Sequence, residues 1–308
     1  MNGLIQAAAD PLDQKVLLVF VDGIGVGNPD PATNPLLRKD LEVLSVMRLL
    51  EELGEVAVTR FAARVLDATL GVPGLPQSAT GQATLLTGVN AAALLGRHLS
   101  GIPNAALRRL LARESLFLKL ARLGVAGDFI NAFSPEFFQF LKRRRLSTTT
   151  WAALAGGRWL RTFADLAAGR ALYQDFTNLF LQNRGYDYPL CRPETAGATL
   201  AALAGRQPFL MYEYFLTDFA GHGRDPEFAG VVVRLLDKFL ESLLQRVDLE
   251  RVTVLLSSDH GNLENLSTKS HTTNPVPLLA WGPRAGDIVG RCRSLADITP
   301  AILAMYQE

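Results

Sequence analysis

The sequence has little of what secreted, membrane-spanning or nucleic-acid-binding proteins need. Only two of its 308 residues are cysteines, Cys191 and Cys292, and their separation suits neither a disulfide framework nor a cysteine metal site. No run reaches the roughly 18 apolar residues that span a bilayer, and the first residues lack the basic start and apolar core of a secretory signal. A formal net charge of +1 gives no electrostatic reason to expect nucleic acid or a membrane as partner. We therefore expect a soluble, cytoplasmic protein.

The composition is that of an ordinary globular protein. Hydrophobic residues make up 48% of the chain and charged residues 20%, which is enough apolar material to bury a sizeable core. A chain of this length exceeds the usual size of a single core. We expect one large α/β domain with an insertion, or two domains.

One stretch, residues 255–277, concentrates polar groups with catalytic potential directly after an apolar run. The β-branched and apolar segment 251–256 is typical of a strand covered on both faces of a parallel sheet. Asp259 and His260 follow it at once, and His271 lies eleven residues after His260 in a loop. Ligands gather at the carboxyl ends of parallel strands, so this pattern indicates a metal site there.

Two other apolar segments end in the same kind of residue. Asp22 follows the expected strand 15–21, and Asp218 and His222 follow the expected strand 208–214. A single Asp in a turn is common, because its carboxylate bonds to its own backbone. Three strand ends with carboxylates, next to three of only four histidines, favour a shared site. Carboxylates and imidazoles without thiolates suit Mn²⁺ or Zn²⁺, and so many ligands indicate two divalent ions.

Ser78 begins an expected helix, 77–88, after a Gly- and Pro-rich turn. The free N–H groups and positive dipole end of a helix N-terminus attract an anion such as phosphate. Serine is also a good N-cap, and one residue can do both. Two ions about 3.5 to 4 Å apart clamp the oxygens of an in-line displacement, and metal coordination would activate the Ser78 hydroxyl as nucleophile.

The remaining pattern predicts elements around this site. Apolar spacing favours helices over residues 41–53, 105–123, 231–247 and 296–305. It favours strands over residues 56–61, 64–70 and 125–131. Residues 131–205 carry much of the aromatic content and are interpreted as an inserted cap. The metal-binding core would then comprise residues 1–130 and 206–308.

Several motifs together resemble the alkaline phosphatase superfamily, in particular its metalloenzyme branch with cofactor-independent phosphoglycerate mutase and phosphopentomutase. They are D-G-x-G at 22–25, S-x-x-G at 78–81, D-x-x-x-H at 218–222, S-D-H-G-N at 258–262 and S-H-T-T-N-P-V-P at 270–277. The last two are highly specific. The resemblance covers roughly residues 15–100 and 208–308, and it implies a three-layer α/β/α sandwich with a mostly parallel central sheet.

The resemblance also implies roles for individual residues. One metal ion would be held by Asp22, Ser78, Asp259 and His260, and the other by Asp218, His222 and His271. Ser78 would form a phosphoseryl intermediate. Thr80 is the alternative nucleophile, but Gly81 follows Ser78 by three residues and Gly88 follows it by ten, and both spacings of the superfamily favour Ser78.

The chain departs from the mutases at two places. Gly81-Gln82 stands where their nucleophile motif continues G-H, and the insertion is too short for the substrate-gripping domain of either mutase. We therefore expect a two-metal phosphoric-ester hydrolase or phosphotransferase acting on a small phosphorylated substrate. A phosphomutase of a small phosphorylated sugar or acid is the alternative, and a non-catalytic metal-binding protein is a third.

Four further polar residues are candidates for binding phosphate oxygens. They are Asn28, Arg97, His98 and Lys269, which lie near expected strand ends or motif residues. Each is equally compatible with a solvated or structural role, because a lone polar residue in a loop is more often one of these. The substrate itself has no recognisable signature in residues 131–205.

Overall fold

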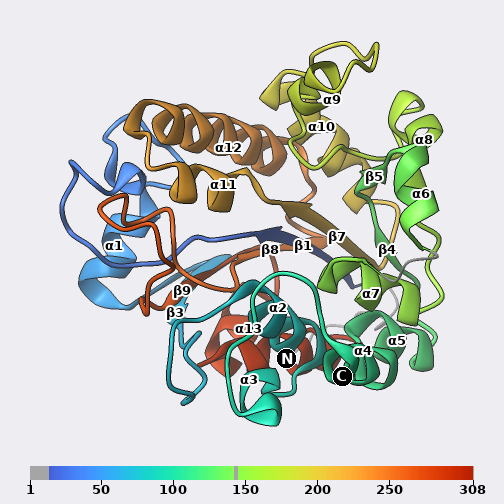
Figure 1. Ribbon diagram of the computed structural model, residues 1–308, viewed down its shortest axis with the longest axis horizontal. Coiled ribbons are helices and arrows are strands. Elements are labelled where there is room, and N and C mark those ends of the chain that lie inside the picture. Colours follow the sequence, from blue (N-terminus) through green and yellow to red (C-terminus); the bar gives the residue numbers. More distant parts are fainter. Residues whose placement is uncertain (1–13, 142–144, 308) are drawn as a thin grey trace, which may run out of the picture.

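A computed structural model describes residues 14–141 and 145–307 of the chain. Its centre is a seven-stranded sheet in the order β2-β3-β9-β8-β1-β7-β4 (Figure 1). The strands are β1 (Lys15–Val21), β2 (Glu55–Val58), β3 (Phe61–Leu66), β4 (Gly127–Phe129), β7 (Phe209–Tyr214), β8 (Val252–Ser257) and β9 (Val276–Trp281). The N-terminal residues considered for a signal lie outside the described residues.

The sheet is mixed, with a parallel half and an antiparallel half. Strands β8, β1, β7 and β4 pair in parallel, whereas β9, β3 and β2 add on in antiparallel order. The strand predicted over 56–61 is shorter than expected, because β2 ends at Val58 and the chain turns at Arg60, which has a φ of 63°. The parallel half carries the strand ends on which the expected site depends.

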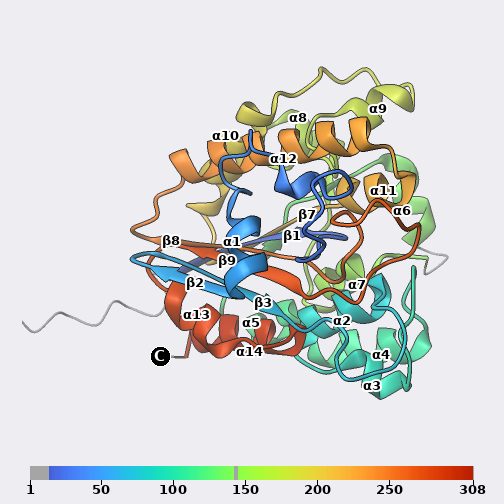
Figure 2. The ribbon, with the colours of Figure 1, turned by 90° about the vertical axis from the view of Figure 1, so that its left-hand side faces the viewer.

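Helices cover both faces of the sheet, as a three-layer α/β/α fold requires (Figure 2). One layer contains α1 (Val46–Leu53), α10 (Pro193–Ala204), α11 (Leu216–Gly223) and α12 (Pro226–Arg246), with a 3₁₀ turn at Pro35–Leu37. The other contains α2 (Ser78–Thr87), α3 (Ala91–Leu95), α4 (Ala105–Glu114), α5 (Leu116–Arg122), α7 (Thr148–Ala155), α13 (Ala285–Arg291) and α14 (Ile298–Ala304), which a 3₁₀ turn at Leu295–Asp297 precedes. The predicted fold class is confirmed.

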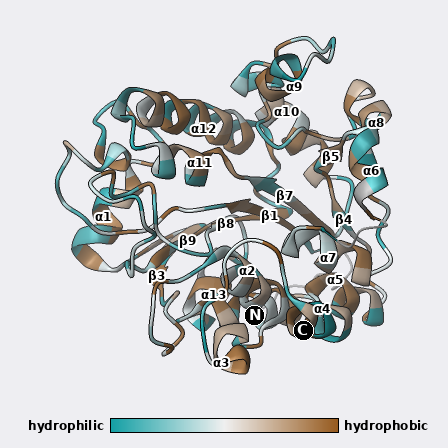
Figure 3. Cartoon of the chain, in the orientation of Figure 1, coloured by the Kyte–Doolittle hydropathy of each residue, from teal (hydrophilic) through white to brown (hydrophobic). Residues whose placement is uncertain are grey.

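Alternate residues of each central strand serve the two cores. Leu17 and Val19 of β1 pack against α12, while Val16, Leu18 and Phe20 pack against the layer of α2 and α4. The central strands are therefore apolar on both faces, as Figure 3 shows. None of the described helices combines the length and apolar character that a membrane crossing requires.

The helix predicted over 105–123 is two helices. Ser115 interrupts it with an extended backbone (φ −61°, ψ 145°), and its side chain accepts a hydrogen bond from the Leu118 backbone as the N-cap of α5. The Ser115 hydroxyl also donates to the Ala152 carbonyl of α7. Serine competes with helical bonding in this way, and uninterrupted apolar spacing does not reveal it.

Residues 131–205 do not all stand over the core. Helix α10 packs against α12, and α7 packs against α2, α4 and α5, so both are parts of the two helical layers. Strands β5 (Ala132–Phe133) and β6 (Arg161–Thr162) with α6 (Pro135–Leu141), α8 (Phe163–Ala167) and α9 (Leu179–Asn183) form the remainder at one side of the molecule (Figure 1). A separate cap domain with these bounds stays a prediction.

Candidate functional site

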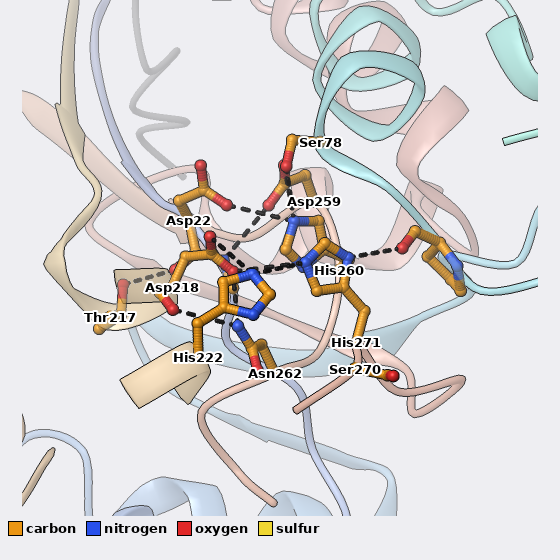
Figure 4. Close-up of polar contacts among 12 residues, drawn as sticks. Asp22, Ser78, Thr217, Asp218, His222, Asp259, His260, Asn262, Ser270 and His271 are labelled. Carbon is orange, nitrogen blue, oxygen red and sulfur yellow. Dashed lines mark hydrogen bonds and ion pairs between the residues drawn. The ribbon is translucent and has the colours of Figure 1, made fainter. Parts of the chain in front are cut away.

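Three neighbouring parallel strands bring three aspartates together at one edge of the sheet. Asp22 directly follows β1, Asp259 follows β8 by two residues, and Asp218 lies in the first turn of α11 after β7. The Asp22 backbone N–H donates to Tyr214 O (2.9 Å), which continues the pairing of β1 with β7 up to the site. The side chains of all three converge in Figure 4.

The first cluster of side chains is buried, and we call it the inner group. The His260 Nε2 atom lies 3.0 Å from Ser78 Oγ, 3.3 Å from Asp22 Oδ1 and 3.6 Å from Asp259 Oδ2. The side chains of His260 and Asp259 are fully buried, and that of Asp22 is 12% exposed. The inner group comprises Asp22, Ser78, Asp259 and His260.

The second cluster, the outer group, is Asp218, His222 and His271. His271 Nε2 lies 3.2 Å from His222 Nε2 and 3.6 Å from Asp218 Oδ1, and His222 Nε2 lies 3.4 Å from Asp218 Oδ2. His222 is 46% exposed, whereas His271 is only 7% exposed. The spacing of four residues places Asp218 and His222 on one face of α11. The outer group therefore opens toward solvent.

The two groups touch through a pair of imidazoles. The rings of His260 and His271 stack with centroids 3.7 Å apart and an interplanar angle of 13°. Ligand atoms of Asp218, His260 and His271 lie within 4.8 Å of one another, as do those of Asp22, Asp259 and His260. All seven predicted ligand residues thus form one continuous cluster.

The electrostatics of the cluster fit divalent cations. Burial, together with the charge of Asp22, raises the pKa of Asp259 well above its usual value and also raises that of Asp218. Burial disfavours a charged His260, yet the neighbouring carboxylates outweigh it and raise its pKa to about 10. Among the described residues, Asp22 Oδ1 has no hydrogen bond of good geometry and faces His260 Nε2 at 3.3 Å. Buried carboxylates that repel one another and keep an oxygen free are expected where metal ions neutralise them.

Ser78 and Thr80 have different surroundings. Gln77, not Ser78, is the N-cap of α2, so the N-cap interpretation of Ser78 is wrong; Ser78 is the first helical residue and is half-buried. Thr80 is fully buried, and its hydroxyl donates to Gln77 O and accepts from the Leu99 backbone. Only the Ser78 hydroxyl of these two contacts the inner group.

Two buried residues that the sequence reasoning did not single out hold the loops of the site. The Glu264 carboxylate accepts hydrogen bonds from Gly25 N (2.9 Å), Asn262 N (2.8 Å) and Asn274 Nδ2 (3.0 Å), and also from the Thr272 hydroxyl. Asn262 Nδ2 donates to Asp218 Oδ1 (2.7 Å). A Cβ on Gly25 would come within 2.4 Å of the Glu264 carboxylate, which explains this glycine. The only sequence signal for Asn262 and Glu264 was their position just after the D-H-G motif at 259–261.

A second buried polar cluster lies beside the inner group. Glu213 on β7 accepts from the Thr149 hydroxyl (2.7 Å), and Asn131 bonds both its backbone N–H and its carbonyl. Burial raises the pKa of Glu213 to about 7, and the charge of Asp22 adds to this. The apolar pattern of 208–214 did not predict a role for this carboxylate, because the sequence around Glu213 indicates only a strand.

The four predicted phosphate-binding residues are not gathered in either group. Asn28 donates to Thr33 Oγ1 in its own loop and to Glu264 O in the loop after β8, and His98 Nε2 lies 3.1 Å from Val72 O. Arg97 and Lys269 are exposed, and the Lys269 carbonyl lies 3.1 Å from His222 Nδ1. Their role in substrate binding stays a prediction.

Comparison with known proteins agrees with this architecture. Residues 193–307 match the model of the metalloenzyme superfamily. A 2,3-bisphosphoglycerate-independent phosphoglycerate mutase of Halobacterium salinarum is 34% identical over 119 residues, which cover 36% of this chain and 23% of the relative. One of Desulforudis audaxviator is 34% identical, with 36% and 23% covered. The chain thus spans less than a quarter of the length of these relatives.

Solved structures share the fold over nearly the whole chain. A protein of Pyrococcus horikoshii is similar with a TM-score of 0.58 and 16% identity, covering 96% of this chain and 97% of that one. A cold-active alkaline phosphatase of a psychrophilic Shewanella species has a TM-score of 0.51 and 11% identity, covering 96% and 100%. The chain therefore has an alkaline-phosphatase-like fold, its residues 193–307 resemble the metalloenzyme superfamily, and about a third of it is similar to independent phosphoglycerate mutases.

Proposed function

We propose that this protein is a metal-dependent phosphoric-ester hydrolase or phosphotransferase that acts through Ser78. The observation that supports it most is the position of the Ser78 hydroxyl, at the N-terminus of α2 and 3.0 Å from the His260 imidazole of the inner group. A half-buried hydroxyl in that position is accessible to a substrate and lies beside the imidazole of the inner group.

Two divalent ions, Mn²⁺ or Zn²⁺, suit the donor atoms of the inner and outer groups. The inner group would hold one ion and the outer group the other. Bound there, the ions supply positive charge that favours a deprotonated serine and balances the charge of a phosphoryl group.

The chain's own groups define the reaction. Ser78 Oγ, having lost its proton, forms a bond to phosphorus while the bond from phosphorus to the ester oxygen breaks, and the leaving alkoxide takes up a proton. The N-terminus of α2 would attract the phosphoryl oxygens, as helix N-termini do for bound phosphate. Water then attacks the phosphoseryl group, which releases inorganic phosphate and restores the hydroxyl. An alcohol in place of water would give transfer.

The test is turnover of a panel of phosphomonoesters and phosphodiesters by protein loaded with Mn²⁺ or Zn²⁺. Ser78→Ala should lower the rate at least about a thousandfold, because the nucleophile is lost. Thr80→Val is the matched control, since Thr80 contacts only the backbone, and it should retain most of the activity. Turnover that survives Ser78→Ala would contradict the proposal.

A phosphomutase is the second candidate, and the 34% identity over 119 residues to a phosphoglycerate mutase supports it. A mutase returns the phosphoryl group from Ser78 to another hydroxyl of the same molecule. With a ³²P-labelled sugar or acid phosphate, label that moves between positions without phosphate release would favour the mutase. Stoichiometric release of phosphate would favour the hydrolase.

A further inference from the structure

Gln82 is the residue through which α2 reaches the carboxylates of the inner group. Its Nε2 atom lies 3.2 Å from Asp22 Oδ2 and 3.1 Å from Asp259 Oδ2. Gln82 is 5% exposed, so these hydrogen bonds are sheltered from water. Gln82 follows Ser78 by one helical turn, which places both side chains on the same face of the helix.

The chemistry of the amide matches this position. A primary amide nitrogen carries two N–H groups, so one atom can donate to both carboxylates at once. It does so without adding a charge. A neutral imidazole nitrogen, in contrast, carries a single proton and could serve only one of them.

The two hydrogen bonds divide the oxygens of each carboxylate between two tasks. The Oδ2 atoms of Asp22 and Asp259 face Gln82, and Asp22 Oδ1 is the oxygen that lies 3.3 Å from His260 Nε2. Among the described residues, no side chain makes a hydrogen bond of good geometry to Asp22 Oδ1. The amide therefore turns this free oxygen toward the imidazole with which it would share an ion.

Close packing of α2 against the segment that follows β8 fixes the amide in place. A Cβ on Gly81 would lie 2.6 Å from the Asp259 carbonyl oxygen, so only glycine permits this approach of the helix. Both Gly81 and Gln82 thereby act on the same aspartate, one by allowing contact and the other by hydrogen bonding.

From this geometry we infer that Gln82 is a positioning residue, which orients Asp22 and Asp259 for a single divalent ion in the inner group. The inference rests on the proposed function, because it assumes that the inner group holds an ion. Partners that hydrogen-bond to metal ligands in this way typically change metal affinity about 10- to 100-fold when they are removed.

The experiment is a calorimetric titration of metal-free full-length protein with MnCl₂ alone. Wild type should bind two ions. Gln82→Met keeps the length and helix propensity of the side chain but removes both N–H groups, and we expect it to weaken one ion about 10- to 100-fold and to leave the other unchanged. Thr84→Val is the matched control, because Thr84 is buried in the same helix and bonds only backbone groups.

Gln82→Asn provides a second variant, which keeps the amide but is one methylene too short to reach both carboxylates. Selective weakening of one ion by either folded variant supports the inference. Unchanged binding of both ions, equal weakening of both, or loss of folding in both variants would overturn it, since Gln82 would then not act on the inner ion in particular. A wild-type protein that binds neither Mn²⁺ nor Zn²⁺ would instead contradict the proposed function itself.

Discussion

The inner and outer groups use the same chemistry in different surroundings. Both combine carboxylate and imidazole, but the inner His260 and Asp259 are fully buried, whereas the outer His222 is 46% exposed. Gln82 of α2 hydrogen-bonds to the inner group, to which Ser78 belongs, and Asn262 hydrogen-bonds to the outer one. Burial strengthens electrostatic interaction and restricts exchange with water. Two candidate metal sites at one edge of a sheet therefore need not be equivalent.

Removing one ligand from each group should separate them most clearly. His271→Ala is expected to weaken the outer ion at least about a hundredfold, and Asp259→Asn should do the same to the inner ion, because each change removes a direct donor. Metal content after dialysis against a limiting Mn²⁺ concentration measures both. His98→Ala is the control, since His98 lies outside both groups. Loss of both ions in each variant would mean that the groups form one indivisible site.

The partly buried carboxyl of Glu213 on β7 extends the comparison beyond the two groups. Its pKa in the fold, about 7, lies above the ordinary value of 4.5, so the folded state holds this proton more tightly than the unfolded state. Its contribution to stability is present below pH 4.5 and is lost as the pH rises through 7, an effect of about 3 kcal/mol.

Glu213→Gln should therefore flatten the dependence of unfolding free energy on pH between 4.5 and 7 in metal-free protein. Denaturant unfolding at a series of pH values measures this. The exposed Glu52→Gln serves as control and should leave the dependence as in wild type. An unaltered slope in Glu213→Gln would show that the carboxyl is already ionised in the fold.

The number of protons released on metal binding should also differ between the inner and outer groups, and this is the smallest of the expected effects. His260 has a pKa of about 10 without metal, whereas burial and the charge of His260 lower that of His271 to about 4. At pH 7 the inner ion should displace about one proton from His260, and the outer ion none from His271. Calorimetric titration in buffers of different ionisation enthalpy counts these protons. Equal release at both sites would contradict the asymmetry.

The apolar pattern predicted the parts of the structure that burial controls. Strands β1, β7 and β8 lie where continuous apolar runs placed them, because a central parallel strand must be hydrophobic on both faces. Ser115 split a predicted helix through a capping bond that apolar spacing does not register. Local signals therefore located the elements better than their ends.

The part of the candidate site that lies in sequence motifs was predictable. Asp22, Asp218 and Asp259 follow strands, so topology alone brings them to one edge. Gln82 and Glu213, in contrast, act through contacts with residues that are 60 or more positions away in the sequence. Gln82 donates to Asp22, and Glu213 accepts a hydrogen bond from Thr149. Such contacts depend on how layers pack, which one sequence does not display.

The four hydrogen bonds to Glu264 have a consequence for the motions of the site. They join the loop after β1, the loop after β8 and the segment before β9 through one buried carboxylate. Opening any one of these loops would leave that charge with an unsatisfied acceptor in the interior, which is costly. The loops should thus open together as one cooperative unit in hydrogen exchange, and the backbone amides of Gly25 and Asn262 should lose protection at the same free energy.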